Sequence, residues 1–179
     1  MKNTCLIAVT AALLAMTSTA LAECPAHLQG EYRKLHSSEN IDLCQLVDNR
    51  PVLVINTASH CGFTKQFEGL ETLHRRYQEQ GLVVIGFASN DFDQEAKDEA
   101  EAADICFTNF GVSFTMLAPT HVKGDQANQL FAELANQGDA PRWNFNKYLL
   151  DRQGKLVEHF GSSVKPDSAR LATAIDKLL

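Results

Sequence analysis

The chain has 179 residues, of which 45% are hydrophobic and 21% charged, as in an ordinary soluble globular protein. This length is enough for one domain with a normal hydrophobic core. The formal net charge of −6 gives no support to nucleic-acid binding, so we expect no nucleic-acid partner.

Residues 1–22 have the pattern of an export signal. Lys2 provides a positive start, an apolar run follows at residues 6–16, and Ala20-Leu21-Ala22 is a small-x-small cleavage site. The run is shorter than the roughly 20 apolar residues of a membrane anchor, so we expect no membrane span. We predict cleavage after Ala22, a mature domain at residues 23–179, and export to the periplasm or the extracellular space. A lipid-anchored form is the alternative, because Cys24 lies close to the cut.

Export changes how the cysteines are interpreted, because disulfides persist in oxidising compartments. Cys5 leaves with the signal, and the four that remain allow three pairings. No two of them have the C-x2-C spacing of a zinc site or a dithiol motif, and we expect neither a metal nor a cofactor. A bridge between Cys24 and Cys44 would close a loop of about 20 residues and contribute roughly 3 kcal/mol. Two unpaired thiols are the alternative.

Residues 23–50 form a polar extension whose apolar side chains could cover an edge or a face of a sheet. Residues 52–55, all aliphatic, predict a buried strand, which runs through a polar turn to Cys61 at the start of a helix over residues 65–80. The positive end of that helix dipole would favour the thiolate. The alternative is a small cysteine buried in the core.

A second buried strand at residues 82–88 completes a right-handed βαβ unit. Further along, the pattern predicts a helix at 95–110, a short strand at 112–116, a helical segment at 125–136, a hairpin at 145–160 and a last helix at 166–179. This order predicts an α/β protein with a central mixed sheet flanked by helices on both faces, the thioredoxin-like arrangement.

Several motifs resemble the glutathione peroxidase family, in family order and over nearly all of the chain from about residue 28. They are NTASHCGFT at 56–64, FEGLE at 67–71, ICFTNFGV at 105–112 and WNFNK at 143–147. The resemblance implies that Cys61 is the peroxidatic cysteine and that Trp143 and Asn144 are two further members of the catalytic tetrad. The fourth member is a glutamine within Asn-Gln-Phe. This chain has Asp91 at its place, and Gln94 three residues on could supply the amide, so both remain open.

The resemblance implies a cysteine-based peroxidase that reduces hydrogen peroxide and organic hydroperoxides. The Cys61 thiolate would attack the peroxide and become a sulfenic acid. The indole N–H of Trp143 and the amide of Asn144 would hold the thiolate and the peroxide. Cys106 matches the resolving cysteine, which family members bring to the peroxidatic one by remodelling its helix. A thioredoxin-like protein or glutathione would then reduce the disulfide.

The segment at residues 123–142 is shorter than in tetrameric family members, which favours a monomer with an open site and a protein reductant. Three other interpretations stay open. A thiol–disulfide oxidoreductase would need a cysteine at the position of Thr64. A redox sensor or relay would pass its disulfide to a partner, and a structural binding domain would hold inert thiols.

Overall fold

The computed structural model describes residues 24–179, and the expected signal at residues 1–22 lies outside this part of the chain. A five-stranded sheet in the order β5-β4-β3-β6-β7 forms its centre. Strands β3, β4 and β5 run parallel, whereas β6 is antiparallel to β3 and β7 to β6. The strands are β3 (Val52–Thr57), β4 (Val83–Ala88), β5 (Thr115–Leu117), β6 (Lys147–Leu150) and β7 (Leu156–Phe160).

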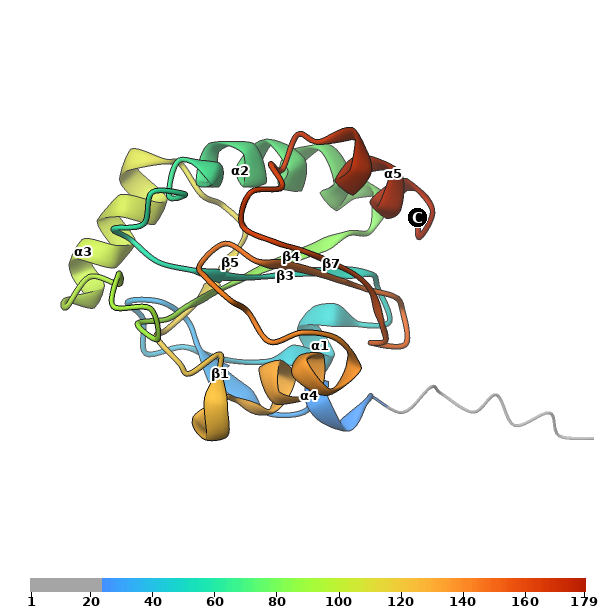
Figure 1. Cartoon of the computed structure of the whole chain (residues 1–179), viewed down its shortest axis with the longest axis horizontal. Helices are drawn as coiled ribbons and strands as arrows, with labels where there is room; N and C mark the ends of the chain where they lie inside the picture. Colours follow the sequence, from blue (N-terminus) through green and yellow to red (C-terminus); the bar gives the residue numbers. More distant parts are fainter. Residues whose placement is uncertain (1–23) are drawn as a thin grey trace, which may run out of the picture.

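Helices cover both faces of the sheet (Figure 1). One face carries α2 (Gln66–Tyr77), α3 (Glu99–Ala103) and α5 (Ala169–Asp176), and the other carries α1 (Leu43–Val47) and α4 (Gln129–Gln137). The short helical turns are η1 (Ala26–Leu28), η2 (Gln78–Gln80), the π-helix η3 (Asp104–Asn109) and η4 (Gly124–Gln126). This architecture confirms the predicted α/β, thioredoxin-like fold.

The sheet separates two hydrophobic cores, and β3 contributes to both. Leu53 and Ile55 face the core under α2, α3 and α5, whereas Val52 and Val54 face the core over α1 and α4. This alternation is the two-residue period of a strand. All six residues of β3 are buried because helices cover both faces of the sheet.

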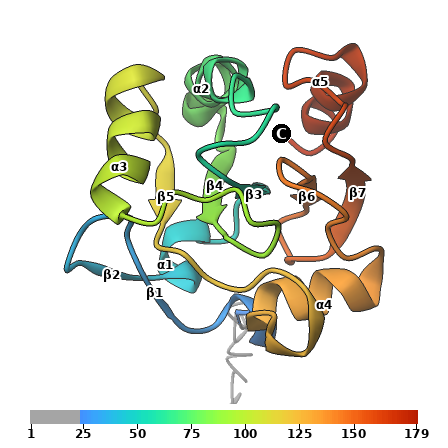
Figure 2. The same cartoon turned by 60° about the vertical axis from the view of Figure 1, so that its left-hand side comes forward.

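The N-terminal extension forms a hairpin of β1 (Glu31–Arg33) and β2 (Asn40–Asp42) next to β5 (Figure 2). Lys34 bridges to Leu117, so the hairpin covers that edge of the sheet. A disulfide joins Cys24 to Cys44, with the Cα atoms 5.8 Å apart, which confirms the expected pairing. Within residues 24–179, no helix is both long and apolar enough to cross a membrane.

Some predicted boundaries differ from those in the structure. The helix expected at 95–110 begins only at Glu99, since Asp98 caps it by accepting from Ala100 N. Its second half is the π-helix η3. The last helix begins at Ala169, after the Ser168 cap, and the strand expected at 112–116 lies at Thr115–Leu117. Each shift is a few residues and leaves the order of elements unchanged.

Candidate active site

Cys61 lies beyond the end of β3, at one edge of the core under α2, α3 and α5. Its side chain is mostly buried, with 8% of the residue exposed. Residues 62–65 form tight turns between Cys61 and α2, which begins at Gln66, one residue after the predicted start. The backbone N–H of Phe63 points at the sulfur, with N and Sγ 3.4 Å apart. This N–H of the turn is in position to donate a hydrogen bond to the Cys61 sulfur.

Thr64 organises this turn. The backbone N–H of Cys61 donates to Thr64 Oγ1 at 3.0 Å, and that hydroxyl donates to Ala58 O at 3.0 Å. A dithiol oxidoreductase would carry its second cysteine at this position. The hydroxyl there bridges two parts of the backbone instead, which argues against the oxidoreductase interpretation.

Gln94 links the Cys61 turn to Asn144. Its backbone carbonyl accepts from His60 N at 2.9 Å, and its side-chain Oε1 accepts from Asn144 Nδ2 at 3.2 Å. Asn144 is fully buried, and its Oδ1 atom has no hydrogen-bond partner within residues 24–179. A buried acceptor without a partner is costly unless a bound group donates to it. Asn144 is thus ready to accept one hydrogen bond at this site.

Asp91 is turned toward a different loop. Its carboxylate accepts from Val122 N at 2.6 Å, His121 Nδ1 at 2.7 Å and Lys123 N at 3.2 Å. Burial opposes ionisation, but these hydrogen bonds outweigh it and lower the pKa of Asp91. Of the two residues that sequence reasoning left open for the fourth position, Gln94 is the one that bonds to Asn144.

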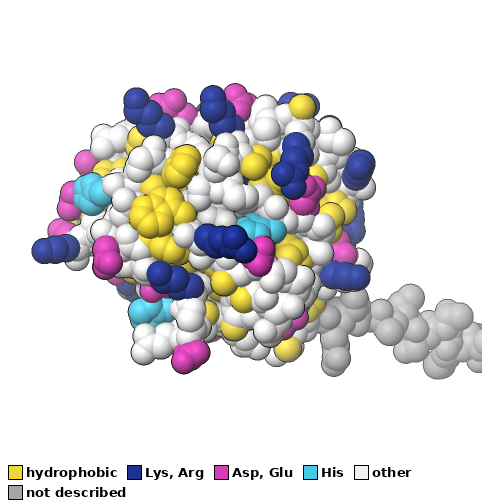
Figure 3. All heavy atoms as spheres, in the orientation of Figure 1, with side chains coloured by type: hydrophobic (Ala, Val, Ile, Leu, Met, Phe, Trp, Pro, Cys, Tyr) yellow, Lys and Arg dark blue, Asp and Glu magenta, His cyan; other side chains and the backbone are white. Residues whose placement is uncertain are grey.

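Trp143 has a fixed backbone and an accessible indole, with 40% of the residue exposed. Its carbonyl accepts from Asn56 Nδ2 at 3.0 Å and Asn146 Nδ2 at 2.7 Å. The ring packs on Phe92, with centroids 5.4 Å apart. Figure 3 shows a group of hydrophobic side chains at the surface over the segment that leads into β6, with lysine and arginine beside it.

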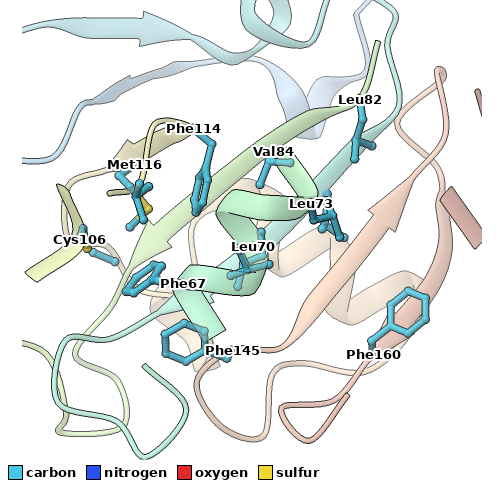
Figure 4. Packing of buried hydrophobic residues seen from close by; sticks show 14 of the residues in the cluster. Phe67, Leu70, Leu73, Leu82, Val84, Cys106, Phe114, Met116, Phe145 and Phe160 are labelled. Atoms are coloured by element: carbon cyan, nitrogen blue, oxygen red, sulfur yellow. The ribbon is translucent and has the colours of Figure 1, made fainter. Parts of the chain in front are cut away.

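Cys106 lies on the π-helix η3 and belongs to the same core as Cys61, close to Phe67 and Met116 (Figure 4). Both cysteines are free thiols in this structure. Burial, together with the charge of Glu95, raises the pKa of Cys106 to about 12. A thiol with such a pKa is a poor nucleophile in this conformation.

Glu95 and Lys147 are two buried charged residues that sequence reasoning did not single out. Glu95 accepts from the backbone and hydroxyl of Ser59, just before the Cys61 turn, and burial raises its pKa against these bonds. Lys147 Nζ donates to Val164 O at 2.7 Å and to Gln66 Oε1. The sequence signal that could have indicated Lys147 is a lysine at the start of an otherwise apolar strand.

Known proteins match both the sequence and the fold of the chain. Residues 30–135 match the sequence model of the glutathione peroxidase family, a stretch that holds Cys61 and Cys106 and ends before Trp143. A glutathione peroxidase of Lactococcus lactis is 41% identical over 134 residues, which are 72% of this chain and 84% of the relative. A hydroperoxy fatty acid reductase of Synechocystis is 40% identical over 144 residues, or 74% and 84% of the two chains.

Solved structures agree with the predicted fold. The crystal structure of Trypanosoma cruzi GPX1 superposes with a TM-score of 0.62 at 26% identity, covering 83% of this chain and 91% of the other. A secreted disulfide oxidoreductase of Mycobacterium tuberculosis gives a TM-score of 0.60 over 85% and 98% of the two chains. Its identity is only 15%, so this likeness concerns the fold alone.

Proposed function

The chain belongs to the glutathione peroxidase family, and on this premise we propose that it reduces hydrogen peroxide and organic hydroperoxides at Cys61. One observation carries the proposal: Gln94 joins the Cys61 turn to Asn144, whose buried Oδ1 has no partner within the described residues. The name of the Synechocystis relative supports hydroperoxides with a fatty acyl chain among the substrates.

In the first step the Cys61 thiolate attacks one peroxide oxygen and the O–O bond breaks. The sulfur gains that oxygen as a sulfenic acid, and the other oxygen leaves and takes up a proton as water or alcohol. The N–H of Phe63 stabilises the thiolate before attack. The unpartnered oxygen of Asn144 can accept from the hydroperoxide O–H, and the indole N–H of Trp143 can donate to the leaving oxygen. No cofactor takes part in these steps.

In the second step Cys106 resolves the sulfenic acid. Its thiolate attacks the Cys61 sulfur, hydroxide leaves and is protonated to water, and a disulfide forms. The raised pKa of Cys106 in the buried π-helix explains why resolution would wait for a rearrangement. A thiol reductant then restores both cysteines.

The reductant is a thioredoxin-like dithiol protein rather than glutathione, and the peroxidase itself acts as a monomer. The short segment at residues 123–142, here η4 and α4, supports both because it leaves the site open to a protein partner. We also propose export, supported by the signal pattern at residues 1–22 and by the Cys24–Cys44 disulfide, which persists in an oxidising compartment.

Peroxide consumption tests this function when wild type, Cys61→Ser and Cys106→Ser are each supplied with thioredoxin and, separately, with glutathione. We expect Cys61→Ser to lose all activity. Cys106→Ser should consume one peroxide per chain and then stop with thioredoxin. Sustained thioredoxin-driven turnover in Cys106→Ser would contradict the resolving role, and activity in Cys61→Ser would contradict the peroxidatic one.

A further inference from the structure

The segment that carries Trp143 and Asn144 has no regular secondary structure of its own, because β6 begins only at Lys147. The main-chain pairing of β3 with β6 ends at Ile55 and Lys147. Contacts other than the main-chain pairing of the sheet must therefore hold Trp143 and Asn144 in place.

Asn56, the next residue of β3, replaces the missing sheet contacts. Its backbone carbonyl accepts from Phe145 N at 2.7 Å, its Oδ1 accepts from Asn146 N at 3.1 Å, and its Nδ2 donates to Trp143 O at 3.0 Å. These three bonds reach three of the four residues at 143–146. Asn56 itself is fully buried.

The backbone at Phe145 is unusual and shows what these bonds achieve. Its φ is +61°, in the left-handed region that a bulky aromatic residue rarely adopts. Such a conformation persists only where the surroundings impose it, and it occurs preferentially at functional sites. Here the bonds from Asn56 fix the peptides on both sides of Phe145, while its ring is buried against Phe67 with centroids 5.2 Å apart.

A second asparagine completes the arrangement from the other side. Asn146 Nδ2 donates to Trp143 O and, at 3.1 Å, to Ser162 Oγ, and its Oδ1 pairs with His159 Nε2 at 2.8 Å. The carbonyl of Trp143 thus has two side-chain donors, so that the peptide before Asn144 has one orientation.

We propose that Asn56 is a positioning residue of the peroxidase site, which uses its three hydrogen bonds to hold Trp143 and Asn144 against the Cys61 turn. The inference rests on the proposed function, because it concerns the same site. It also explains the sequence arrangement: Asn56 stands at the end of the strand that leads to Cys61, so one residue links the sulfur-bearing turn to its hydrogen-bonding partners.

The test compares Asn56→Ala and Asn56→Asp with Val54→Ala, a control on the same strand. Val54 is equally buried but packs in the opposite core, away from Cys61. Three quantities are measured on folded protein: the rate constant of Cys61 with hydrogen peroxide, its alkylation rate with iodoacetamide, and the emission of Trp143, the one tryptophan of the chain.

For Asn56→Ala we expect the peroxide rate to fall about 10- to 100-fold, because small misplacements of reacting groups are that costly. Alkylation, which needs only the thiolate, should change less than about twofold, and the Trp143 emission should shift. Asn56→Asp keeps an acceptor for Asn146 N but loses the donor to Trp143 O, so its peroxide rate should lie between those of wild type and Asn56→Ala. Val54→Ala should match wild type in all three.

Two results would overturn the inference. One is an unchanged peroxide rate in Asn56→Ala. The other is a loss in Asn56→Ala that affects the peroxide and alkylation rates equally and that Val54→Ala shows as well. Failure of the proposed function itself looks different. In that case wild-type Cys61 would not react with peroxide at all, while the Trp143 emission would still report whether Asn56 holds the segment.

Discussion

Removing the Cys24–Cys44 disulfide should destabilise the chain by about 3 kcal/mol. The two cysteines are 20 residues apart in sequence, and the chain-entropy relation for a loop of this length gives about 3 kcal/mol at 25 °C. For a protein of this size, such a loss corresponds to a fall in Tm of about 6 to 12 °C.

The peroxide chemistry should survive this loss, because the disulfide lies on the far face of the sheet. Cys24 and Cys44 pack against the core over α1 and α4, whereas Cys61 and Cys106 belong to the other core. We therefore expect Cys24→Ser/Cys44→Ser to keep the wild-type rate constant with hydrogen peroxide at 25 °C.

Urea unfolding, followed by circular dichroism, measures the stability. Both chains should carry Cys61→Ser and Cys106→Ser in this experiment, so that no free thiol can attack the bridge. A loss below about 1 kcal/mol would refute the reasoning, since the loop-entropy effect would then be absent. In the otherwise wild-type chain, a slower peroxide reaction without the bridge would refute the separation of the two faces.

Three further substitutions test the account of the site and its surroundings. Gln94→Ala should slow the peroxide reaction about 10- to 100-fold, because it leaves the buried Nδ2 of Asn144 without its acceptor, whereas Asp91→Asn should keep the wild-type rate; the reverse order would return the fourth position to Asp91. Asp91→Asn should instead lower the free energy of unfolding at pH 7. Because the pKa of Asp91 is lowered in the folded chain, its contribution is lost on acidification, so the gap to wild type should narrow as the pH falls below about 4 in urea titrations. Lys147→Met should remove a pH dependence. Burial lowers the pKa of Lys147 from 10.5 to about 7, so between these values the unfolded amine holds a proton that the folded one lacks, and wild-type stability should rise relative to the variant by up to about 1.4 kcal/mol per pH unit. Parallel stability curves at pH 7 and pH 9 would show that Lys147 is not buried as a neutral amine.

The core strands could be predicted from the sequence because their local pattern and their final environment agree. Residues 52–55 and 82–88 are continuous apolar runs, and the structure buries β3 and β4 on both faces. The helix that follows β3 was also predicted to within one residue at its start, since its apolar residues recur at helical spacing.

The beginning of α3 could not be predicted in the same way. Residues 95–97 are good helix formers, but the carboxylate of Glu95 bonds to Ser59, which is 36 residues away in the sequence, and Asp98 caps the helix that follows it. A contact between distant parts of the chain decided the local conformation.

The candidate site likewise contains residues that the sequence predicts and contacts that only the structure shows. Cys61, Cys106, Trp143 and Asn144 were named through short motifs that resemble a family. The motifs could not show that Gln94, rather than Asp91, bonds to Asn144, or that Asn56 hydrogen-bonds to residues 143–146. Both depend on which side chains the sheet brings together.

Mass analysis of the chain after one equivalent of hydrogen peroxide tests the central claim most directly. Wild type should gain a Cys61–Cys106 disulfide beside the intact Cys24–Cys44 bridge, and Cys106→Ser should carry one added oxygen, on Cys61. Oxygen on another residue, or a Cys61 that stays reduced while peroxide is consumed, would contradict the account.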